Sequence, residues 1–420
     1  MKPGRLLSAS SYFTLRFHKG DVANGGALDV ADSTWPVVSL PDGIELLPEE
    51  ASGNLNYQGK VWYRKHFVAD AAWKNKKTFI HFEGIMGKSE VWVNGRLLQK
   101  HYGGYLPVVV DLSASLKYGA KNVIAVWADN SDDPSYPPGK AQDVLDYTYF
   151  GGIYRDCWLI THDRLYITDP NYENEVAGGG LFISYPQVSD KQAHVAISLQ
   201  LRNEYAQKRK GTVAYRLKDK LGNCVAKCNK SFSLLPQQAA VFQSELSVKN
   251  PSLWSPESPS LYYLEVCVKD EKGKIIDGYE RRIGIRSIEM KGKDGLWLNG
   301  KPYPGKLIGG NRHQDFAVIG NALPNSLHWR DAYKLRNAGM TVIRSAHYPQ
   351  DPAFLDACDE LGLFIIDATP GWQFYNKDTV FVNRVYDDIR NMVRRDRNHP
   401  SLLFWEPVLN ETGFPLEFAL

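Results

Sequence analysis

The chain has 420 residues, of which 43% are hydrophobic, and this length can bury the cores of about two to four domains. Its 50 Lys and Arg residues nearly balance 47 Asp and Glu residues. The net charge of +3 is too small, and the basic residues are too scattered, to predict a nucleic-acid or membrane-binding protein. Five cysteines without a repeated spacing predict neither a disulfide framework nor a zinc site.

No run of residues is long and apolar enough to cross a membrane, and the N-terminal stretch lacks the apolar core of a signal peptide. We therefore expect a soluble protein, and the sequence leaves open whether it is periplasmic or cytoplasmic. The 11 Trp and 23 Tyr residues are a second compositional feature. Their flat faces suit the apolar faces of sugar rings, although β-rich domains also use many aromatic residues for packing alone.

Residues 1–163 are predicted to form an all-β domain, because short runs of alternating polar and apolar residues are separated by turn residues. The runs cover residues 58–68, 77–82, 89–93 and 122–127. Asn94 and Gly95 form a two-residue hairpin signal, since both residue types tolerate positive φ angles. Many short strands with frequent turns are typical of a jelly-roll β-sandwich.

Residues 164–286 are predicted to form a second all-β domain. Strand-like runs recur at the spacing of a sandwich, at residues 193–199, 212–217 and 261–268. The length of about 120 residues fits one immunoglobulin-like β-sandwich.

The pattern changes at about residue 287, where short apolar runs begin to alternate with helical stretches, as in βα units. Candidate strands cover residues 305–309, 341–344, 363–367 and 402–406, and candidate helices cover residues 326–338, 351–361 and 379–396. Four such strands are half of an eight-stranded barrel. Residues 287–420 are therefore predicted to form the first half of a (β/α)8 TIM barrel.

Polar residues follow the predicted barrel strands, where the active-site groups of such barrels lie. In chain order they are Arg312 and His313, His347, Asp367, and Asn410 with Glu411. Groups that donate and accept hydrogen bonds from several strands suit a hydroxyl-rich ligand. We therefore take them together as a candidate ligand site.

Some residues in this region also have purely structural explanations. Arg344 lies inside an apolar strand and can pair with a buried carboxylate, and Asp367 can cap the segment that follows it. Asp396 and Arg397 can form a charge pair at a helix end. Taken alone, a Glu such as Glu411 is usually a solvated surface charge.

A series of ordered motifs resembles glycoside hydrolase family 2, the β-galactosidase and β-glucuronidase family. The barrel motifs are Asn311 to Asp315, Val342 to Pro349, Cys358 to Asp367, Arg395 to Pro400, and Trp405 through Asn410-Glu411. The N-terminal motifs are Trp35 with Leu40-Pro41, Val91 to Gly95 followed by Gly103 to Tyr105, and Gly151 to Asp156. The likeness covers essentially the whole chain, as the N-terminal domains and part of the catalytic domain.

The resemblance implies roles for individual residues. Glycoside hydrolysis normally uses two carboxyl groups, one to protonate the leaving oxygen and one to attack. By resemblance, Glu411 is the general acid/base of a retaining mechanism, and Asn410 contacts the sugar 2-hydroxyl. His313 and His347 match histidines that line the sugar site, and Asp146 matches an Asp that reaches into that site from the first domain.

The chain departs from the family pattern in two places. Ala368 stands where the third strand usually has Glu, and the Glu and His that bind magnesium in metal-dependent β-galactosidases are missing. We therefore expect no metal and no cofactor, and we expect Trp372 to offer a stacking platform instead. The segment between Trp405 and Asn410 is one residue longer than usual, which places a second carboxylate, Glu406, nearby.

We therefore expect a retaining exo-glycosidase that releases a terminal β-linked sugar from a glycoside or oligosaccharide, with galactose as the first candidate. A β-glucuronidase or β-mannosidase of the same family, or a non-catalytic carbohydrate-binding protein, are the alternatives, and a homo-oligomer stays open. The nucleophile of the family is a Glu on a later strand, around the seventh. We expect it beyond Leu420, and we expect the 420 residues alone to lack hydrolytic activity.

Overall fold

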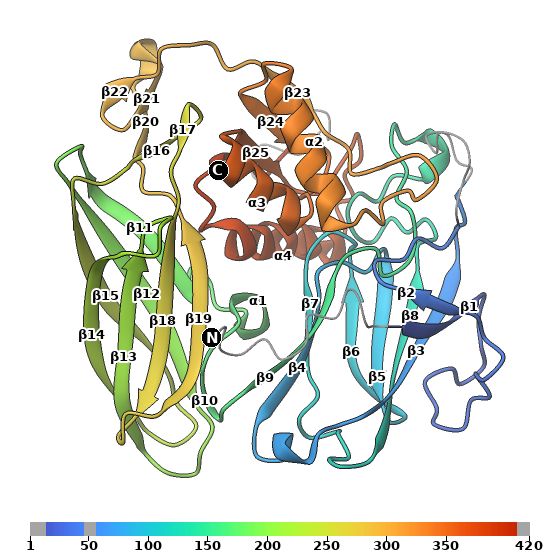
Figure 1. The fold of residues 1–420 in the computed structure, drawn as a ribbon. Helices are drawn as coiled ribbons and strands as arrows, with labels where there is room; N and C mark the ends of the chain where they lie inside the picture. The colour runs from blue at the N-terminus through green and yellow to red at the C-terminus, as the bar shows by residue number, and fades with distance from the viewer. Residues whose placement is uncertain (1–13, 46–55, 410–420) are drawn as a thin grey trace.

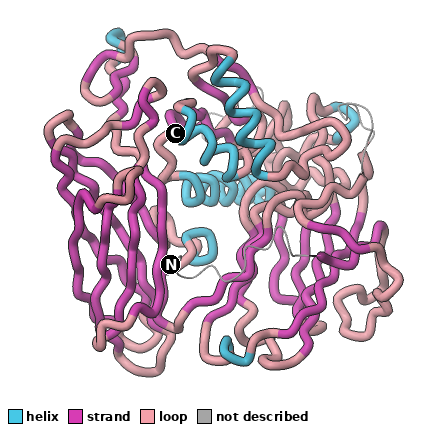
Figure 2. Tube along the Cα trace, in the orientation of Figure 1, coloured by secondary structure: helices cyan, strands magenta, loops and turns pink. Residues whose placement is uncertain are grey.

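The computed structural model describes residues 14–45 and 56–409. Two β-sandwiches stand side by side, and a smaller α/β part lies across the top of both (Figure 1). Figure 2 shows that most of the helical residues belong to this third part. None of the helices among the described residues has the length and apolar character needed to cross a membrane.

The first β-sandwich packs a six-stranded sheet, in the order β2-β1-β3-β8-β5-β6, against a three-stranded sheet, β7-β4-β9. Its strands are β1 (Thr14–Lys19), β2 (Val37–Ser39), β3 (Lys60–Val68), β4 (Lys77–Phe82), β5 (Lys88–Val93), β6 (Arg96–Tyr102), β7 (Val108–Asp111), β8 (Lys121–Asp129) and β9 (Cys157–His162). Inward side chains of the two sheets, such as Val61 of β3 and Ile80 of β4, form one buried core. Burial of such apolar surface is the main stabilising contribution.

The predicted hairpin between β5 and β6 is confirmed. Asn94 has a φ of 51° and Gly95 a φ of 85°, so both residues adopt the left-handed conformation that the turn requires. The four runs predicted as strands in this domain correspond to β3, β4, β5 and β8.

The second β-sandwich pairs a sheet of β10, β12, β11 and β15 with a sheet in the order β14-β13-β18-β19. Its elements are β10 (Leu165–Ile167), α1 (Pro170–Glu173), β11 (Leu181–Val188), β12 (Gln192–Asn203), β13 (Arg209–Lys218), β14 (Cys224–Leu234), β15 (Ala239–Lys249), β18 (Tyr262–Asp270) and β19 (Ile275–Ile283). Leu264, Val266 and Val268 alternate inward along β18 and join a separate core. The predicted immunoglobulin-like sandwich is confirmed.

The third part begins with a short three-stranded ribbon and continues as a parallel sheet. The ribbon contains β20 (Ile288–Met290), β21 (Leu296–Leu298) and β22 (Lys301–Pro302), and a separate two-stranded ribbon of β16 (Trp254–Ser255) with β17 (Ser258–Pro259) precedes β18 in the second sandwich. The parallel part contains β23 (Gly309–Asn311), α2 (Asn325–Asn337), β24 (Val342–Ser345), α3 (Pro352–Leu361), β25 (Phe364–Ala368), α4 (Thr379–Asp396) and β26 (Leu402–Glu406). The order β23-β24-β25-β26 is that of consecutive TIM-barrel strands.

Local sequence signals explain where these helices begin and end. Asp351 caps α3 by accepting the N–H of Ala353 at 2.8 Å, Pro352 occupies the first turn, and Gly362 ends the helix with a φ of 74°. Asp378 caps α4 in the same way, by accepting the N–H of Val380 at 2.7 Å. The helices therefore fall close to their predicted ranges.

The first barrel strand differs from the prediction. The sequence predicts a strand over residues 305–309, whereas β23 starts only at Gly309, which pairs with Val342 of β24. A Cβ atom at Gly309 would lie 1.6 Å from the carbonyl oxygen of Val342. The close approach at a glycine sets the start of this strand, and apolar residues alone did not indicate it.

The half-buried carboxyl of Asp42 gives a stability prediction for the first sandwich. Burial raises the pKa of Asp42 from 3.8 to about 6, although the Tyr63 hydroxyl donates a hydrogen bond to it at 2.8 Å. Between pH 4 and 6 the unfolded chain releases this proton while the native protein retains it. Stability contributed by the neutral acid is therefore lost as the pH rises through this window.

Asp42→Asn is accordingly expected to stabilise the protein at pH 7 by about 2–3 kcal/mol, since one pKa unit corresponds to about 1.4 kcal/mol. The amide oxygen still accepts the Tyr63 hydrogen bond. Urea unfolding of both proteins at pH 3.5 and 7 tests this, with exposed Asp29→Asn as the control. An equal stability of wild type and Asp42→Asn at both pH values would contradict it.

Candidate active site

Three loops at the carboxyl edge of the parallel sheet bring aromatic side chains together. His313 follows β23, His347 follows β24, and Trp372 follows β25. The ring centroids of His313 and His347 are 5.6 Å apart, and those of His347 and Trp372 are 4.1 Å apart. Three of the predicted site residues therefore form one contiguous cluster, which we call the strand-end cluster.

Tyr147 completes the strand-end cluster from the first β-sandwich. Its ring centroid lies 5.3 Å from that of His313 and 5.7 Å from that of His347. Asp146, the predicted site residue, is its exposed chain neighbour and acts electrostatically on His313. The sequence motifs indicate Asp146 but not Tyr147. The aromatic run at residues 147–150 signals burial, and Tyr147 and Tyr149 both join the same buried cluster.

The strand-end cluster holds buried polar atoms that have no hydrogen-bond partner among the described residues. They are Nδ1 of His313, Nε1 of Trp372 and the hydroxyl of Tyr147. Burial lowers the pKa of His313 against the opposing effect of Asp315 and Asp146, so the imidazole is neutral at pH 7. A neutral imidazole offers one donor and one acceptor, which is what a sugar hydroxyl needs.

Arg312, another predicted site residue, supports the loop after β23. Its guanidinium donates to Gln350 at 2.6 Å and to Asp331 at 2.7 Å, and it stacks over the ring of Phe354 at 4.1 Å. The side chain is only 6% exposed. These contacts hold the loop that carries His313 against α2 and α3.

Arg344 and Glu406 form an ion pair on the face of the sheet that points into the barrel. Arg344 Nε donates to Glu406 Oε2 at 2.7 Å, and a second nitrogen of the guanidinium donates to the other carboxylate oxygen. The alternative explanation for Arg344, pairing with a buried carboxylate, is therefore correct as to the ion pair, although Glu406 is half-buried. Because Arg344 occupies both oxygens of Glu406, this carboxylate is poorly placed to donate a proton to a leaving group.

Asp367 lies on the opposite face of the sheet, toward α4. Its Oδ1 accepts a hydrogen bond from Ser345 Oγ at 2.8 Å. Burial and the adjacent Asp396 raise the pKa of Asp367 well above its ordinary value. The expected charge pair of Asp396 with Arg397 is wrong, because Asp396 pairs with Arg395 at 2.6 Å and Arg397 turns to backbone carbonyls.

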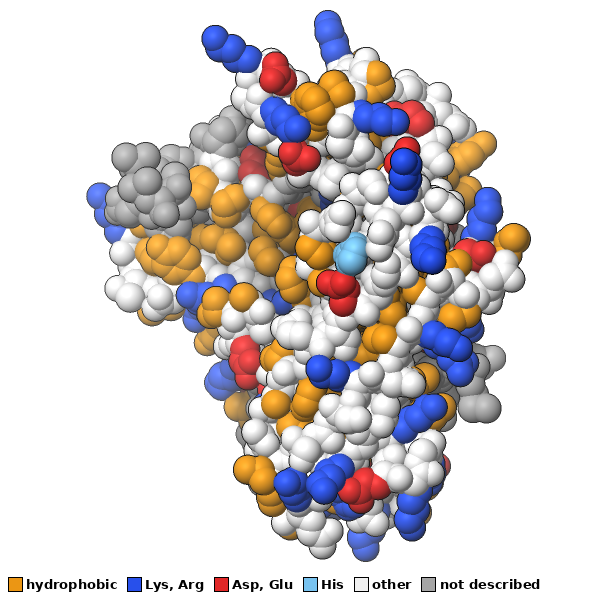
Figure 3. Space-filling view, turned by 90° about the vertical axis from the view of Figure 1, so that its left-hand side faces the viewer, with side chains coloured by type: hydrophobic (Ala, Val, Ile, Leu, Met, Phe, Trp, Pro, Cys, Tyr) orange, Lys and Arg blue, Asp and Glu red, His pale blue; other side chains and the backbone are white. Residues whose placement is uncertain are grey.

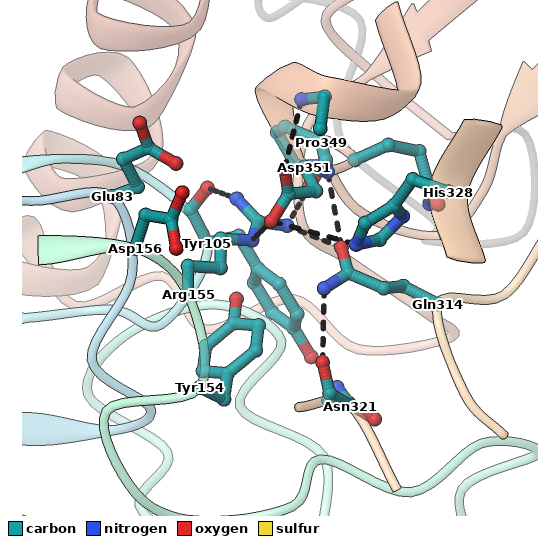
Figure 4. Close-up of polar contacts among 12 residues, drawn as sticks. Glu83, Tyr105, Tyr154, Arg155, Asp156, Gln314, Asn321, His328, Pro349 and Asp351 are labelled. Carbon is teal, nitrogen blue, oxygen red and sulfur yellow. Dashed lines mark hydrogen bonds and ion pairs between the residues drawn. The ribbon is translucent and has the colours of Figure 1, made fainter. Parts of the chain in front are cut away.

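Arg155 of the first β-sandwich forms hydrogen bonds to the barrel loops (Figure 4). Its fully buried guanidinium donates to the carbonyl oxygens of Tyr105 and Pro349, each at 2.7 Å, and to Oε1 of Gln314 at 2.9 Å. Its Nε lies 3.7 Å from the carboxylate of Asp351. Gln314 and Pro349 belong to the loops that carry His313 and His347, so this network fixes the strand-end cluster relative to Tyr147.

One group of side chains in the described residues has the spacing of metal ligands, namely Asp356, Asp359 and His399. Internal contacts already satisfy it, since His399 Nδ1 lies 2.7 Å from Asp359 and the N–H of Ser401 donates to Asp359 at 3.0 Å. Arg282 pairs with Asp356 at 2.9 Å. The donor set therefore serves packing between α3 and the turn after α4.

Asn410 and Glu411, the predicted sugar contact and acid/base, lie outside the described residues. The last described residues after β26 are 407–409. Glu411 follows the carboxyl end of β26 in sequence, and this end borders β25 and its loop.

Three family models match consecutive parts of the chain. The sugar binding domain of glycosyl hydrolases family 2 matches residues 47–163, a second domain of that family matches residues 180–286, and its TIM barrel domain matches residues 288–419. The chain has two β-sandwiches, followed in sequence by a parallel barrel sheet that carries the strand-end cluster. This combination defines a class of multidomain barrel proteins. Within this class, the chain belongs to glycosyl hydrolases family 2.

Individual relatives agree with this assignment. The beta-galactosidase of Thermoanaerobacter pseudethanolicus is 32% identical over 394 residues, which cover 93% of this chain and 50% of that protein. A beta-glucuronidase of Formosa agariphila is 30% identical over 406 residues, which cover 93% of this chain and 41% of that protein. The chain thus spans about half the length of the curated relatives it matches.

A solved structure shows the same fold. Bacteroides uniformis beta-glucuronidase 2, covalently bound to cyclophellitol-6-carboxylate aziridine, has a TM-score of 0.86 and 29% sequence identity to this chain. The match covers 96% of this chain and 47% of that structure. The predicted architecture of jelly roll, immunoglobulin-like sandwich and partial TIM barrel is confirmed.

Proposed function

We propose that the protein to which this chain belongs is a retaining exo-glycosidase that acts on terminal β-linked galactose. The observation that carries this proposal is the convergence of His313, His347 and Trp372 on Tyr147 at the carboxyl edge of the barrel sheet. Membership of glycosyl hydrolases family 2 supports the reaction class, and the named relatives support a β-glycoside as substrate.

The strand-end cluster can recognise a sugar by shape and by hydrogen bonds. Trp372 and Tyr147 present rings that exclude water, while the neutral imidazole of His313 can donate to one hydroxyl and accept from another. The Arg155 network keeps these groups in place before the substrate arrives. Such preorganisation lowers the entropic cost of binding.

Glu411 would protonate the leaving oxygen, and Asn410 would hydrogen-bond the 2-hydroxyl. In a retaining reaction a second carboxylate, about 5–5.5 Å from the first, attacks the anomeric carbon and forms a glycosyl-enzyme. Glu411 then acts as a base on the incoming water. Glu406 is a second carboxylate near Glu411 in the sequence, but its pairing with Arg344 favours an ion-pair role.

The choice of galactose over glucuronate rests on charge. A glucuronate carboxylate calls for a cation, usually Arg or Lys, as its partner. Arg344 lies near the carboxyl end of β24, and its guanidinium is already bonded to Glu406. This arrangement supports an uncharged sugar.

The substrate proposal is tested with p-nitrophenyl β-galactoside, β-glucuronide and β-mannoside, using protein expressed from the whole gene. We expect kcat/KM to be highest for the galactoside, by at least about 10-fold, because a misplaced or charged substituent leaves buried polar groups unpaired. A higher value for the glucuronide would overturn the sugar assignment. Sugar binding in calorimetry without turnover of any of the three would instead support a non-catalytic binding protein.

A further inference from the structure

A cleft of about 300 Å³ lies between the immunoglobulin-like sandwich and the barrel part, and none of its lining residues belongs to the strand-end cluster. Three segments line it: Ile183 to Tyr185 of β11, the link after β19 at residues 286–288, and the turn after α4 at residues 397–400. Its cationic lining residues include Arg286 and Arg397, and no Asp or Glu lines it. Figure 3 shows one face of the molecule, on which Lys, Arg, Asp and Glu side chains are interspersed.

Neither arginine has an ion-pair partner among the described residues. Arg286 donates to the carbonyl oxygen of Leu402, and Arg397 donates to the carbonyl oxygens of Gly178 at 3.2 Å and Gly179 at 2.5 Å. The Nε atoms of both arginines are buried and have no hydrogen-bond partner in this part of the chain. Each guanidinium therefore keeps donors that the protein does not use.

The partly buried surroundings of Arg286 and Arg397 make it energetically unfavourable to leave their positive charges without a counter-charge. Burial lowers the pKa of both Arg286 and Arg397 to about 10, so both remain charged at neutral pH. The acidic residue that acts on Arg286 is Asp359, but its two oxygens already accept from Ser401 and contact His399. The ionisable neighbour that acts on Arg397 is another cation, Arg394. Charges that are taken out of water are normally balanced by an opposite charge.

We propose that this cleft is a binding site for a small oxyanion of the phosphate or sulfate class, held by Arg286 and Arg397. The planar guanidinium matches the oxygens of such anions and is less strongly hydrated than an ammonium group. The hydroxyl groups of Ser184 and Ser287 line the same cleft and can donate to further oxygens. The cleft joins β11 to the turn after α4, so the bound anion stabilises the junction of two domains.

Phosphate binding is tested by thermal unfolding of the protein in sodium phosphate and in sodium chloride at equal ionic strength. An anion that binds only the native state raises Tm, here by at least about 2 °C at saturation. Arg286→Gln and Arg397→Gln are each expected to abolish the difference between the two salts. Arg390→Gln is the matched control, because Arg390 is an exposed arginine paired with Asp387 on α4, and it should keep the full difference.

If a variant fails to fold, two further measurements on the wild-type protein can still contradict the proposal. Broadening of the phosphate line in ³¹P NMR with the wild-type protein reports binding directly. Added sulfate should displace the phosphate and sharpen this line. Acetate serves as a second arm, since competition by acetate but not by sulfate would indicate a carboxylate site and overturn the assignment. Equal Tm values in phosphate and chloride, or retention of the difference in both arginine variants, would also overturn it.

Discussion

Replacing Glu411 by Gln is expected to lower kcat/KM for a β-galactoside by about 10²–10⁴-fold, because general acid/base catalysis contributes about that much. The protein should be expressed from its whole gene, and the substrate should carry a leaving group that needs protonation, such as an alkyl glycoside. KM is expected to change less than kcat, since Gln keeps the shape of the side chain and its hydrogen-bonding capacity.

The leaving group distinguishes an acid/base from a residue that only supports the site. A dinitrophenyl glycoside needs no proton on its leaving oxygen, so Glu411→Gln should slow formation of the glycosyl-enzyme from it far less than from the alkyl glycoside. Glu406→Gln is the comparison variant. If Glu406→Gln showed this leaving-group dependence and Glu411→Gln did not, the roles of the two carboxylates would have to be exchanged.

Arg155→Met is expected to destabilise the protein by about 3–5 kcal/mol, the usual cost of removing one partner from a buried charged network. The substitution removes the donors to Tyr105, Pro349 and Gln314, and it leaves the carboxylate of Asp351 buried beside His328. Urea unfolding at pH 7 measures the change in free energy. The Arg155 guanidinium bonds to the loops after both β23 and β24, so kcat/KM should also fall when it is removed.

Arg390→Met is the control for the Arg155 prediction. Arg390 pairs with Asp387 three residues earlier on α4, at the surface, and exposed pairs of this kind contribute only about 0–0.5 kcal/mol. A loss of less than 1 kcal/mol for Arg155→Met would contradict the role of this network in joining the first sandwich to the barrel.

Much of the fold follows from local sequence patterns. The alternation along β18 and the positive φ angles at Asn94 and Gly95 are properties of short segments, and both were predictable. The Asp and Pro residues that begin α3 likewise act within a few residues. The start of β23 was not predictable in this way, because it depends on the approach of Gly309 to Val342, a residue on another strand.

The candidate site was predictable only in part, for a related reason. His313, His347 and Trp372 each follow a barrel strand, so the parallel topology brings them together. Tyr147 comes from a loop of a different domain, and no spacing in the sequence indicates its contact with the histidines. Arg397 shows the same limit, since its position beside Asp396 predicts an ion pair that the geometry does not form.

The stereochemistry of the first product tests directly whether the protein is a retaining glycosidase. ¹H NMR of a freshly mixed reaction, with protein from the whole gene and a β-galactoside, resolves the anomeric proton of the sugar released before it mutarotates. A retaining mechanism, with Glu411 as acid/base and a second carboxylate as nucleophile, predicts that β-galactose appears first. Initial release of α-galactose would contradict a retaining mechanism.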